Sequence, residues 1–217
     1  MMAVPMEPSP RHQCLIYEGA PSRQLRAIAA VMREKLEQNY RCLYLNSPPM
    51  VAGMRSYLAA VGVDVTQEIE KESLVLSSEQ GHLASGQFDV DGMIHTLEDG
   101  LDQALGKGYT GLWATGDMTW EMGPKKDFSR LLEYEWRLER FLRENEKAGG
   151  ICQYHTDTLP SETVRLAFLA HRSIFVSETL SRLNPHYMPT GTFDEAATRK
   201  PELDAAIERL CQAPVAS

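Results

Sequence analysis

The chain has 217 residues, of which 43% are apolar and 8% aromatic, so it is long enough to form one large domain with a buried core. It carries 22 basic and 30 acidic residues, and no stretch gathers the Lys and Arg that binding nucleic-acid phosphates requires. Its apolar runs are far shorter than the ~20 residues that cross a bilayer. Prolines within residues 1–12 also interrupt any apolar core of a signal peptide. We therefore expect a cytoplasmic protein without a direct nucleic-acid or membrane partner.

The four cysteines, Cys14, Cys42, Cys152 and Cys211, form no CxxC pair. Three of them lie in short apolar segments that are typical of buried strands, where a free cysteine behaves as a small apolar side chain. This pattern predicts reduced thiols, and it gives no reason to expect a zinc site, another metal or a cofactor.

Short apolar runs alternate with segments of helical periodicity, and this alternation is typical of βαβ units on a parallel sheet. The sequence therefore predicts an α/β fold, a three-layer sandwich with a mostly parallel central sheet. The expected strands are 13–17, 41–45, 74–76, 111–114, 151–154 and 173–176.

Helical periodicity fills most of the intervening segments. The first expected helix has Ser22 as its N-cap and an apolar stripe that continues to Leu36. Further helices are expected over 50–61, 90–105 and 126–147. Another is expected to begin near Pro160, and an amphipathic terminal helix is expected through Leu203 and Leu210. Polar loops are expected over 77–87 and 115–125. The predicted organisation is a flexible N-terminus (1–11), a central domain (12–189) and a helical tail (190–217) that packs loosely or against a partner.

In an open parallel sheet, ligands bind beyond the carboxyl ends of the strands. The residues that follow the predicted strands and that we take as candidate ligand-binding residues are Glu18, Asn46, Asp117, Trp120 and His155. Each has a structural alternative. Asp117 is suited to hold a polar ligand or to cap a helix, and Trp120 to cover a pocket or to anchor a loop. His155 is suited to acid–base or ligand contact, or to a structural hydrogen bond.

The first loop, 18–23, stands where a nucleotide-binding fold carries GxxxxGK[ST]. It has one glycine and no lysine, and Glu18 would repel phosphate. The loop is therefore a degenerate P-loop, and no catalytic residue is assigned.

One acidic residue interrupts the apolar stripe of the long helix predicted over 126–147. Glu135 stands where a hydrophobic side chain is expected, and a carboxylate on a buried face must be paired or neutralised. The loop after the fourth strand, His155 and nearby arginines are candidate partners. An internal ion pair and a sensing or proton-linked role both remain open, so Glu135 joins the candidate ligand-binding residues.

Five runs of the sequence are long and unusual: 12–19, 39–55, 112–120, 132–136 and 151–155, which read HQCLIYEG, NYRCLYLNSPPMVAGMR, LWATGDMTW, LEYEW and ICQYH. Together they resemble the MEDS family, the methanogen/methylotroph DcmR sensory domain, over about residues 12–189. The resemblance implies a RecA/KaiC-like fold and the sensing of small hydrocarbon derivatives for histidine kinases or transcription regulators. It transfers no residue roles.

The first hypothesis is thus a non-catalytic signalling domain that binds a small-molecule effector and relays the signal to a regulatory protein, a kinase or transcription regulator, or to a second copy in a homodimer. A second is a degenerate nucleotide-binding hydrolase or transferase that uses Asp117, Glu135 and His155. A third is a pure protein-interaction module with no ligand.

Overall fold

Seven strands form one sheet at the centre of the protein. The computed structural model describes residues 11–79, 81, 83–84, 86–123, 127–188 and 197–212. The strand order is β3-β2-β6-β7-β1-β8-β9, and every neighbouring pair is parallel except β8 and β9. The strands are β1 (His12–Tyr17), β2 (Arg41–Leu45), β3 (Leu74–Ser77), β6 (Leu112–Asp117), β7 (Ala148–His155), β8 (Ser173–Ser177) and β9 (Leu180–Leu183). The predicted α/β class with a mostly parallel sheet is confirmed.

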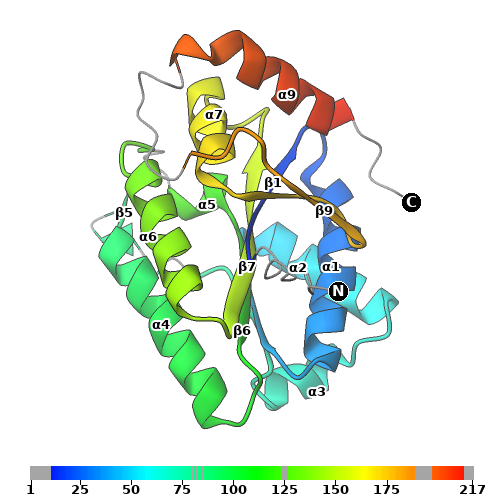
Figure 1. The fold of residues 1–217 in the computed structure, drawn as a ribbon. Helices are drawn as coiled ribbons and strands as arrows, with labels where there is room; N and C mark the ends of the chain where they lie inside the picture. Colours follow the sequence, from blue (N-terminus) through cyan, green and yellow to red (C-terminus); the bar gives the residue numbers. More distant parts are fainter. Residues whose placement is uncertain are drawn as a thin grey trace, which may run out of the picture.

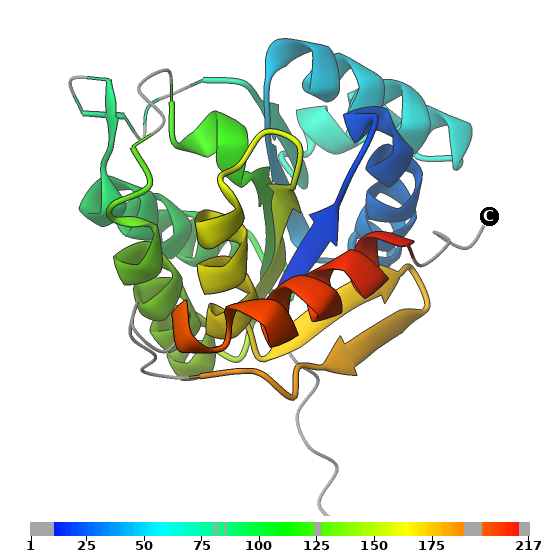
Figure 2. The same ribbon diagram turned by 90° about the horizontal axis from the view of Figure 1, so that it is seen from above.

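Helices cover both faces of the sheet and give the predicted three layers (Figures 1 and 2). One face is covered by α1 (Leu25–Glu37), α2 (Pro48–Ala60) and α3 (Val65–Glu70). The other is covered by α4 (Val90–Gly106), α6 (Leu131–Glu144) and α7 (Ser161–Ala170). A two-stranded hairpin, β4 (Leu83–Ala84) with β5 (Gln87–Phe88), lies outside the main sheet.

The alternation of side chains along β1 divides the interior into two cores. Cys14 and Ile16 pack with α4, α6 and α7, whereas Leu15 and Tyr17 pack with α1 and α2. Residues on neighbouring strands follow the same rule, because β1 pairs in register with β7. Two residues adjacent in sequence therefore contribute to different sides of the molecule.

The terminal helix α9 (Lys200–Gln212) packs on the body of the protein beside α7 (Figure 1). Leu203, Ala206 and Ile207 are buried in the same core as α7, and Arg165 of α7 pairs with Asp204 at 2.8 Å. The helix was predicted correctly, but its expected loose packing is wrong.

Several predicted boundaries are also corrected. Strand β6 continues to Asp117, and a short helix, α5 (Met118–Glu121), occupies the predicted loop; residues 124–126 lie outside the described part. Helix α6 begins at Leu131 rather than 126, because the Asp127 carboxylate accepts a hydrogen bond from the Ser129 N–H at 3.0 Å and holds a turn before it.

Two further differences concern the ends of elements. Ser22 lies within a 3-10 turn, η1 (Pro21–Gln24), and does not cap α1. Gly150 precedes the strand predicted over 151–154 but lies inside β7, where a Cβ would stand 2.1 Å from the carbonyl oxygen of Ala114 on β6. Glycine is required there because the two backbones approach so closely.

The predicted flexible N-terminus lies outside the described residues apart from Arg11, and the predicted tail is described only over 197–212. Among the described residues, no helix combines the length and hydrophobicity needed to cross a lipid bilayer. Cys14, Cys42, Cys152 and Cys211 are free thiols, and the first three are buried as predicted.

Candidate functional site

The structure places the six predicted site residues on different sides of the sheet. Asn46, Asp117 and His155 are buried at the carboxyl ends of β2, β6 and β7, as expected. Glu18 is exposed after β1, and Trp120 is half-buried and packs against the core beneath α4 and α6. Glu135 is fully buried on α6, on the opposite face of the sheet from Asn46, Asp117 and His155.

The residues at the carboxyl ends form what we call the edge cluster: Tyr17, Tyr44, Asn46, Asp117 and His155. The Tyr17 hydroxyl donates to Asp117 at 3.2 Å, and the Tyr17 ring stacks on His155 with centroids 4.8 Å apart. The Asn46 amide donates to the Tyr44 hydroxyl at 3.0 Å. Asp117 also accepts from the Trp120 N–H at 3.0 Å and so caps α5. Most polar groups of this cluster are therefore used to hold the strand ends and α5.

The loop after β1 does not offer its backbone to a phosphate group. The N–H of Gly19, which has a positive φ of 80°, donates to the Asp157 carboxylate at 2.8 Å. A carboxylate on this amide and the exposed Glu18 nearby make the loop a poor anion site.

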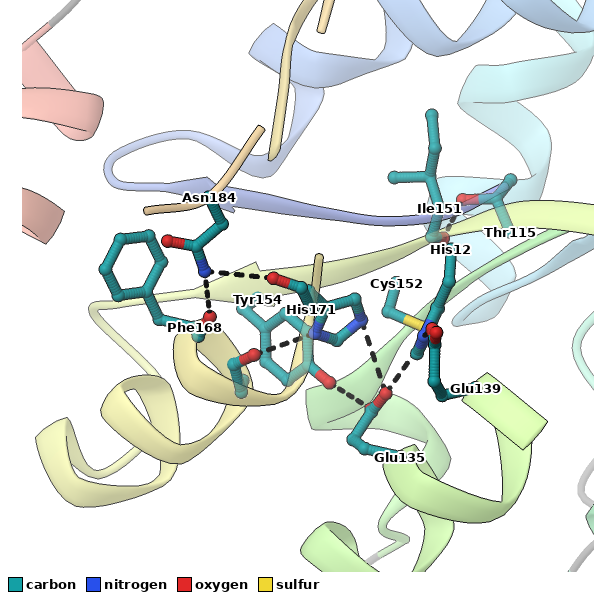
Figure 3. Close-up of polar contacts among 11 residues, drawn as sticks. His12, Thr115, Glu135, Glu139, Ile151, Cys152, Tyr154, Phe168, His171 and Asn184 are labelled. Carbon is teal, nitrogen blue, oxygen red and sulfur yellow. Dashed lines mark hydrogen bonds and ion pairs between the residues drawn. The ribbon is translucent and has the colours of Figure 1, made fainter. Parts of the chain in front are cut away.

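A second group lies deep between the sheet and helices α6 and α7 (Figure 3), and we call it the interior cluster: His12, Glu135, Cys152, Tyr154 and His171. Glu135 Oε2 lies 3.2 Å from His12 Nε2 and 3.3 Å from His171 Nε2. The Tyr154 hydroxyl donates to Glu135 Oε1. Cys152 Sγ lies 3.8 Å from His12 Nε2.

Four elements bring these side chains together. His12 and Cys152 share the face of the sheet that alternation assigns to α6, and Glu135 interrupts the buried stripe of that helix. His171 is the C-cap residue of α7. The Asn184 amide donates to the backbone carbonyl of His171 at 2.9 Å, which fixes the chain at the end of α7.

Burial and mutual contact set the charges of the interior cluster. Burial alone would lower the pKa of His12, but Glu135 and Glu139 outweigh it and raise that pKa to about 9. Burial, with the charge of His12, lowers the pKa of His171 to about 4. Burial alone would raise the pKa of Glu135, but the two imidazoles and Tyr154 hold it below its ordinary value. At neutral pH the cluster contains a charged His12–Glu135 pair and a neutral His171.

A small cavity of about 40 Å³ adjoins the interior cluster, between the sheet and helices α4 and α6. His12 and Cys152 are in its wall, but most of its lining is apolar, with Leu97 from α4 and Phe141 from α6 among the residues. Glu121 also faces it, and burial raises the pKa of this carboxyl well above its ordinary value. The cavity thus offers a neutral acid and a thiol in apolar surroundings.

A glycine makes room for that acid. A Cβ on Gly116 would stand 1.6 Å from Glu121 Oε1, so the carboxyl group packs directly on the backbone of β6. Glu121 belongs to α5, the helix that Asp117 caps. One short segment therefore joins the edge cluster on one face of the sheet to the cavity on the other.

Residues 11–172 match the family model described as MEthanogen/methylotroph, DcmR Sensory domain (MEDS). The chain belongs to the MEDS family. This MEDS domain therefore has a sensory or signalling role. No curated protein matches its sequence.

Among solved structures, the MEDS domain is similar to the crystal structure of flagellar accessory protein FlaH from Methanocaldococcus jannaschii. The TM-score is 0.50 at 11% sequence identity, over 84% of this chain and 82% of that chain. At this identity the likeness shows the fold alone, and it confirms the RecA/KaiC-like architecture.

The sequence predicted that Glu135 of the MEDS domain is buried, but it did not identify the residues that contact its carboxylate. The predicted internal ion pair is present, yet the expected partners, His155 and arginines, are wrong: the carboxylate contacts His12, His171 and Tyr154. Alternation along β1 was a usable signal for His12, because it places that ring on the face of Cys14. No comparable signal pointed to His171, whose position depends on where α7 ends.

Proposed function

We propose that this MEDS domain senses a small, partly apolar molecule bound in the cavity between the sheet and helices α4 and α6, and relays its presence to a partner protein. The observation that supports this most is the mostly apolar cavity, whose wall also carries Glu121, an acid that burial holds neutral. Cavities of this kind favour ligands that are largely apolar and carry one hydrogen-bonding group.

The size of the cavity limits the effector. One water molecule needs about 10–15 Å³ of cavity volume, and the volume of this cavity is about 40 Å³. This is room for roughly three atoms of that size, as in a short alcohol or a halomethane. A charged ligand would have to give up its hydration to enter, which costs several kcal/mol or more without a counter-charge.

We place the effector in the cavity rather than among the predicted edge residues, because the polar side chains of the edge cluster other than His155 are paired with one another or with α5. His155 Nε2 is buried without a hydrogen bond to any described residue. Trp120 follows Asp117 on α5 and packs on the same core as the cavity lining. A ligand that shifts Glu121 would move α5 and the loop after it, and so bias a surface that a partner reads. The partner is a cytoplasmic kinase or transcription regulator, or a second copy of this chain.

The nucleotide-hydrolase alternative is less well supported. It requires Asp117, Glu135 and His155 in one active site, whereas Glu135 lies on the opposite face of the sheet from the other two. The Gly19 amide, which a phosphate group would need, is bound by Asp157.

Calorimetry and thermal shift with short alcohols, halomethanes and methylated amines, and with ATP for comparison, test the proposal. We expect binding of at least one small compound, and loss of it in Ala114→Val, which adds two methyl groups to the cavity wall. One methylene in an apolar pocket changes affinity by about 10–200-fold. The matched control, Ala59→Val, makes the same change on the exposed side of α2 and should bind normally.

Binding of ATP together with no response to any of the small compounds would contradict the proposal. Equal affinity in wild type and Ala114→Val would place the effector elsewhere and so reject this cavity as the site.

A further inference from the structure

Four metal-ligand side chains converge in the interior cluster. His12 Nε2, Glu135 Oε2, Cys152 Sγ and His171 Nε2 all lie within 4.8 Å of one another. Three of their separations are 3.2, 3.3 and 3.8 Å. A tetrahedral ion with bonds of about 2.0–2.3 Å holds its ligand atoms roughly 3.3–3.7 Å apart. Three of the six separations are therefore close to the size that one ion requires, and the other three are at most 4.8 Å.

Each imidazole and the carboxylate is oriented by a second contact on its other polar atom. His12 Nδ1 lies 2.9 Å from the Glu139 carboxylate, and His171 Nδ1 lies 2.7 Å from the carbonyl oxygen of Ala167. The Tyr154 hydroxyl donates to Glu135 Oε1. Such outer contacts are characteristic of metal sites, because they fix the ligand atom and its orientation.

The contact between His171 and Glu135 is completed by a cation, either a proton on the imidazole or a metal ion. A carbonyl oxygen only accepts, so His171 Nδ1 must carry the proton toward Ala167, and Nε2 of the neutral ring is a lone pair. That lone pair faces Glu135 Oε2 at 3.3 Å, and neither atom has a hydrogen bond of acceptable geometry within the described residues. Both are completely buried. Two such acceptors facing each other are unfavourable unless a proton or a metal ion lies between them. The same Glu135 oxygen also lies 3.2 Å from His12 Nε2, so one ion at this point would contact all three side chains.

We propose that His12, Glu135, Cys152 and His171 bind one divalent transition-metal ion, with zinc as the ion that this set of nitrogen, sulfur and oxygen donors suits best. The thiolate and the carboxylate neutralise the two positive charges, so the buried site carries no net charge from ion and ligands. On binding, Cys152 and the His12 imidazolium each release a proton to solvent, and no bond is otherwise made or broken. Tyr154 and Glu139 position ligands and do not contact the ion.

The set was not visible in the sequence, because its donors come from β1, α6, β7 and the end of α7. No two donors have the short spacing that marks a zinc motif. Only the packing of α6 and α7 on the sheet brings them together.

Cobalt substitution tests the site directly in the full chain. The chain is stripped with chelator, titrated with Co²⁺ and then with Zn²⁺, and followed by visible and near-ultraviolet absorption. We expect one ion per chain, d–d bands of tetrahedral cobalt, a thiolate-to-cobalt charge-transfer band, and displacement of cobalt by zinc.

Two cysteine variants provide a matched pair. Cys14→Ser alters a residue that pairs in register with Cys152 on the neighbouring strand. Cys14 is also buried and is not part of the set. Cys152→Ser should abolish the charge-transfer band, and Cys14→Ser should keep it. Glu139→Gln should retain the band and weaken zinc affinity by about 10–100-fold, as expected for an outer contact.

The absence of tetrahedral cobalt bands in the wild-type chain would overturn the proposal and leave a buried His12–Glu135 ion pair as the role of the cluster. The amount of zinc bound per wild-type chain after zinc loading tests the proposal even where a variant fails to fold. A stoichiometry near zero would also overturn it, without affecting the effector proposal, which is tested by organic ligands.

Discussion

The two polar clusters of this MEDS domain lie on opposite faces of one sheet and are held together differently. In the edge cluster, neutral groups such as Tyr17 and Asn46 donate hydrogen bonds, and Asp117 caps a helix. In the interior cluster, a charged pair and a neutral imidazole are buried together. The first arrangement is explained by the needs of strand ends, whereas the second costs desolvation that packing alone would not require. We infer that the buried His12–Glu135 pair serves the function of the domain, because packing does not require it.

The largest difference between the clusters is expected on removing Glu135. Glu135→Ala removes the completely buried one of the two carboxylates that pair with His12 and leaves only Glu139, at 2.9 Å. Breaking a buried pair in this way costs about 3–5 kcal/mol of unfolding free energy. Urea unfolding measures it. Glu133→Ala, on the exposed side of the same helix, removes surface pairs with Arg130 and Arg137 and should cost less than about 1 kcal/mol. Similar losses in the two variants would show that Glu135 does not stabilise a buried charge.

Two tyrosines allow the clusters to be compared by the same substitution. Tyr154→Phe removes a hydrogen bond to the charged Glu135 and should cost about 1.5–3 kcal/mol. Tyr17→Phe removes a bond to the Asp117 carboxylate that is long for an O–H···O bond, at 3.2 Å, and keeps the ring beside His155, so about 1 kcal/mol is expected.

Chemical denaturation of both tyrosine variants checks this order. A greater loss in Tyr17→Phe would show that the edge cluster, and not the interior one, holds the more strongly interacting groups.

A smaller, pH-dependent effect is expected at Glu121, between the clusters. Burial raises the folded-state pKa of this acid well above the unfolded value, which is about 4.3. Above that unfolded value the folded chain keeps a proton that the unfolded chain has lost. Wild-type stability therefore falls as pH rises, by up to about 1.4 kcal/mol per pH unit, until the pH passes the folded pKa.

Glu121→Gln lacks this titration, so its stability relative to wild type should increase with pH. Urea unfolding of both proteins at about pH 5 and about pH 8 measures the difference. A difference that stays constant over this range would show that Glu121 is not held protonated.

The sequence predicted the class of fold, because strand and helix periodicity are local signals. It also predicted that Asn46, Asp117 and His155 lie at the carboxyl ends of the strands. It also predicted that Glu135 is buried and paired, since a charge in an apolar stripe is visible without coordinates. The residues that contact Glu135 could not be predicted from the sequence. His12 and His171 are distant from Glu135 in the chain, and only the packing of α6 and α7 brings the three together.

Some local features were not predicted from the sequence either, because their signals are short or ambiguous. Asp117 ends a strand and caps α5 at once, and a helix of four residues leaves too short a pattern to recognise. Asp127 delays the start of α6 through a side-chain hydrogen bond that competes with the helix. Gly150 lies just before the strand predicted over 151–154, yet it belongs to β7, where its small size allows close strand packing.

Helix α6 belongs to both proposed sites. Its Glu135 and Glu139 face His12, and Leu138, Phe141 and Leu142 of the same helix line the cavity. An organic molecule that pushes this helix outward would also displace its carboxylates. Thermodynamic reciprocity then requires that the ion and the organic molecule alter each other's affinity by the same factor. A domain built this way would report the joint presence of two inputs rather than the level of either one.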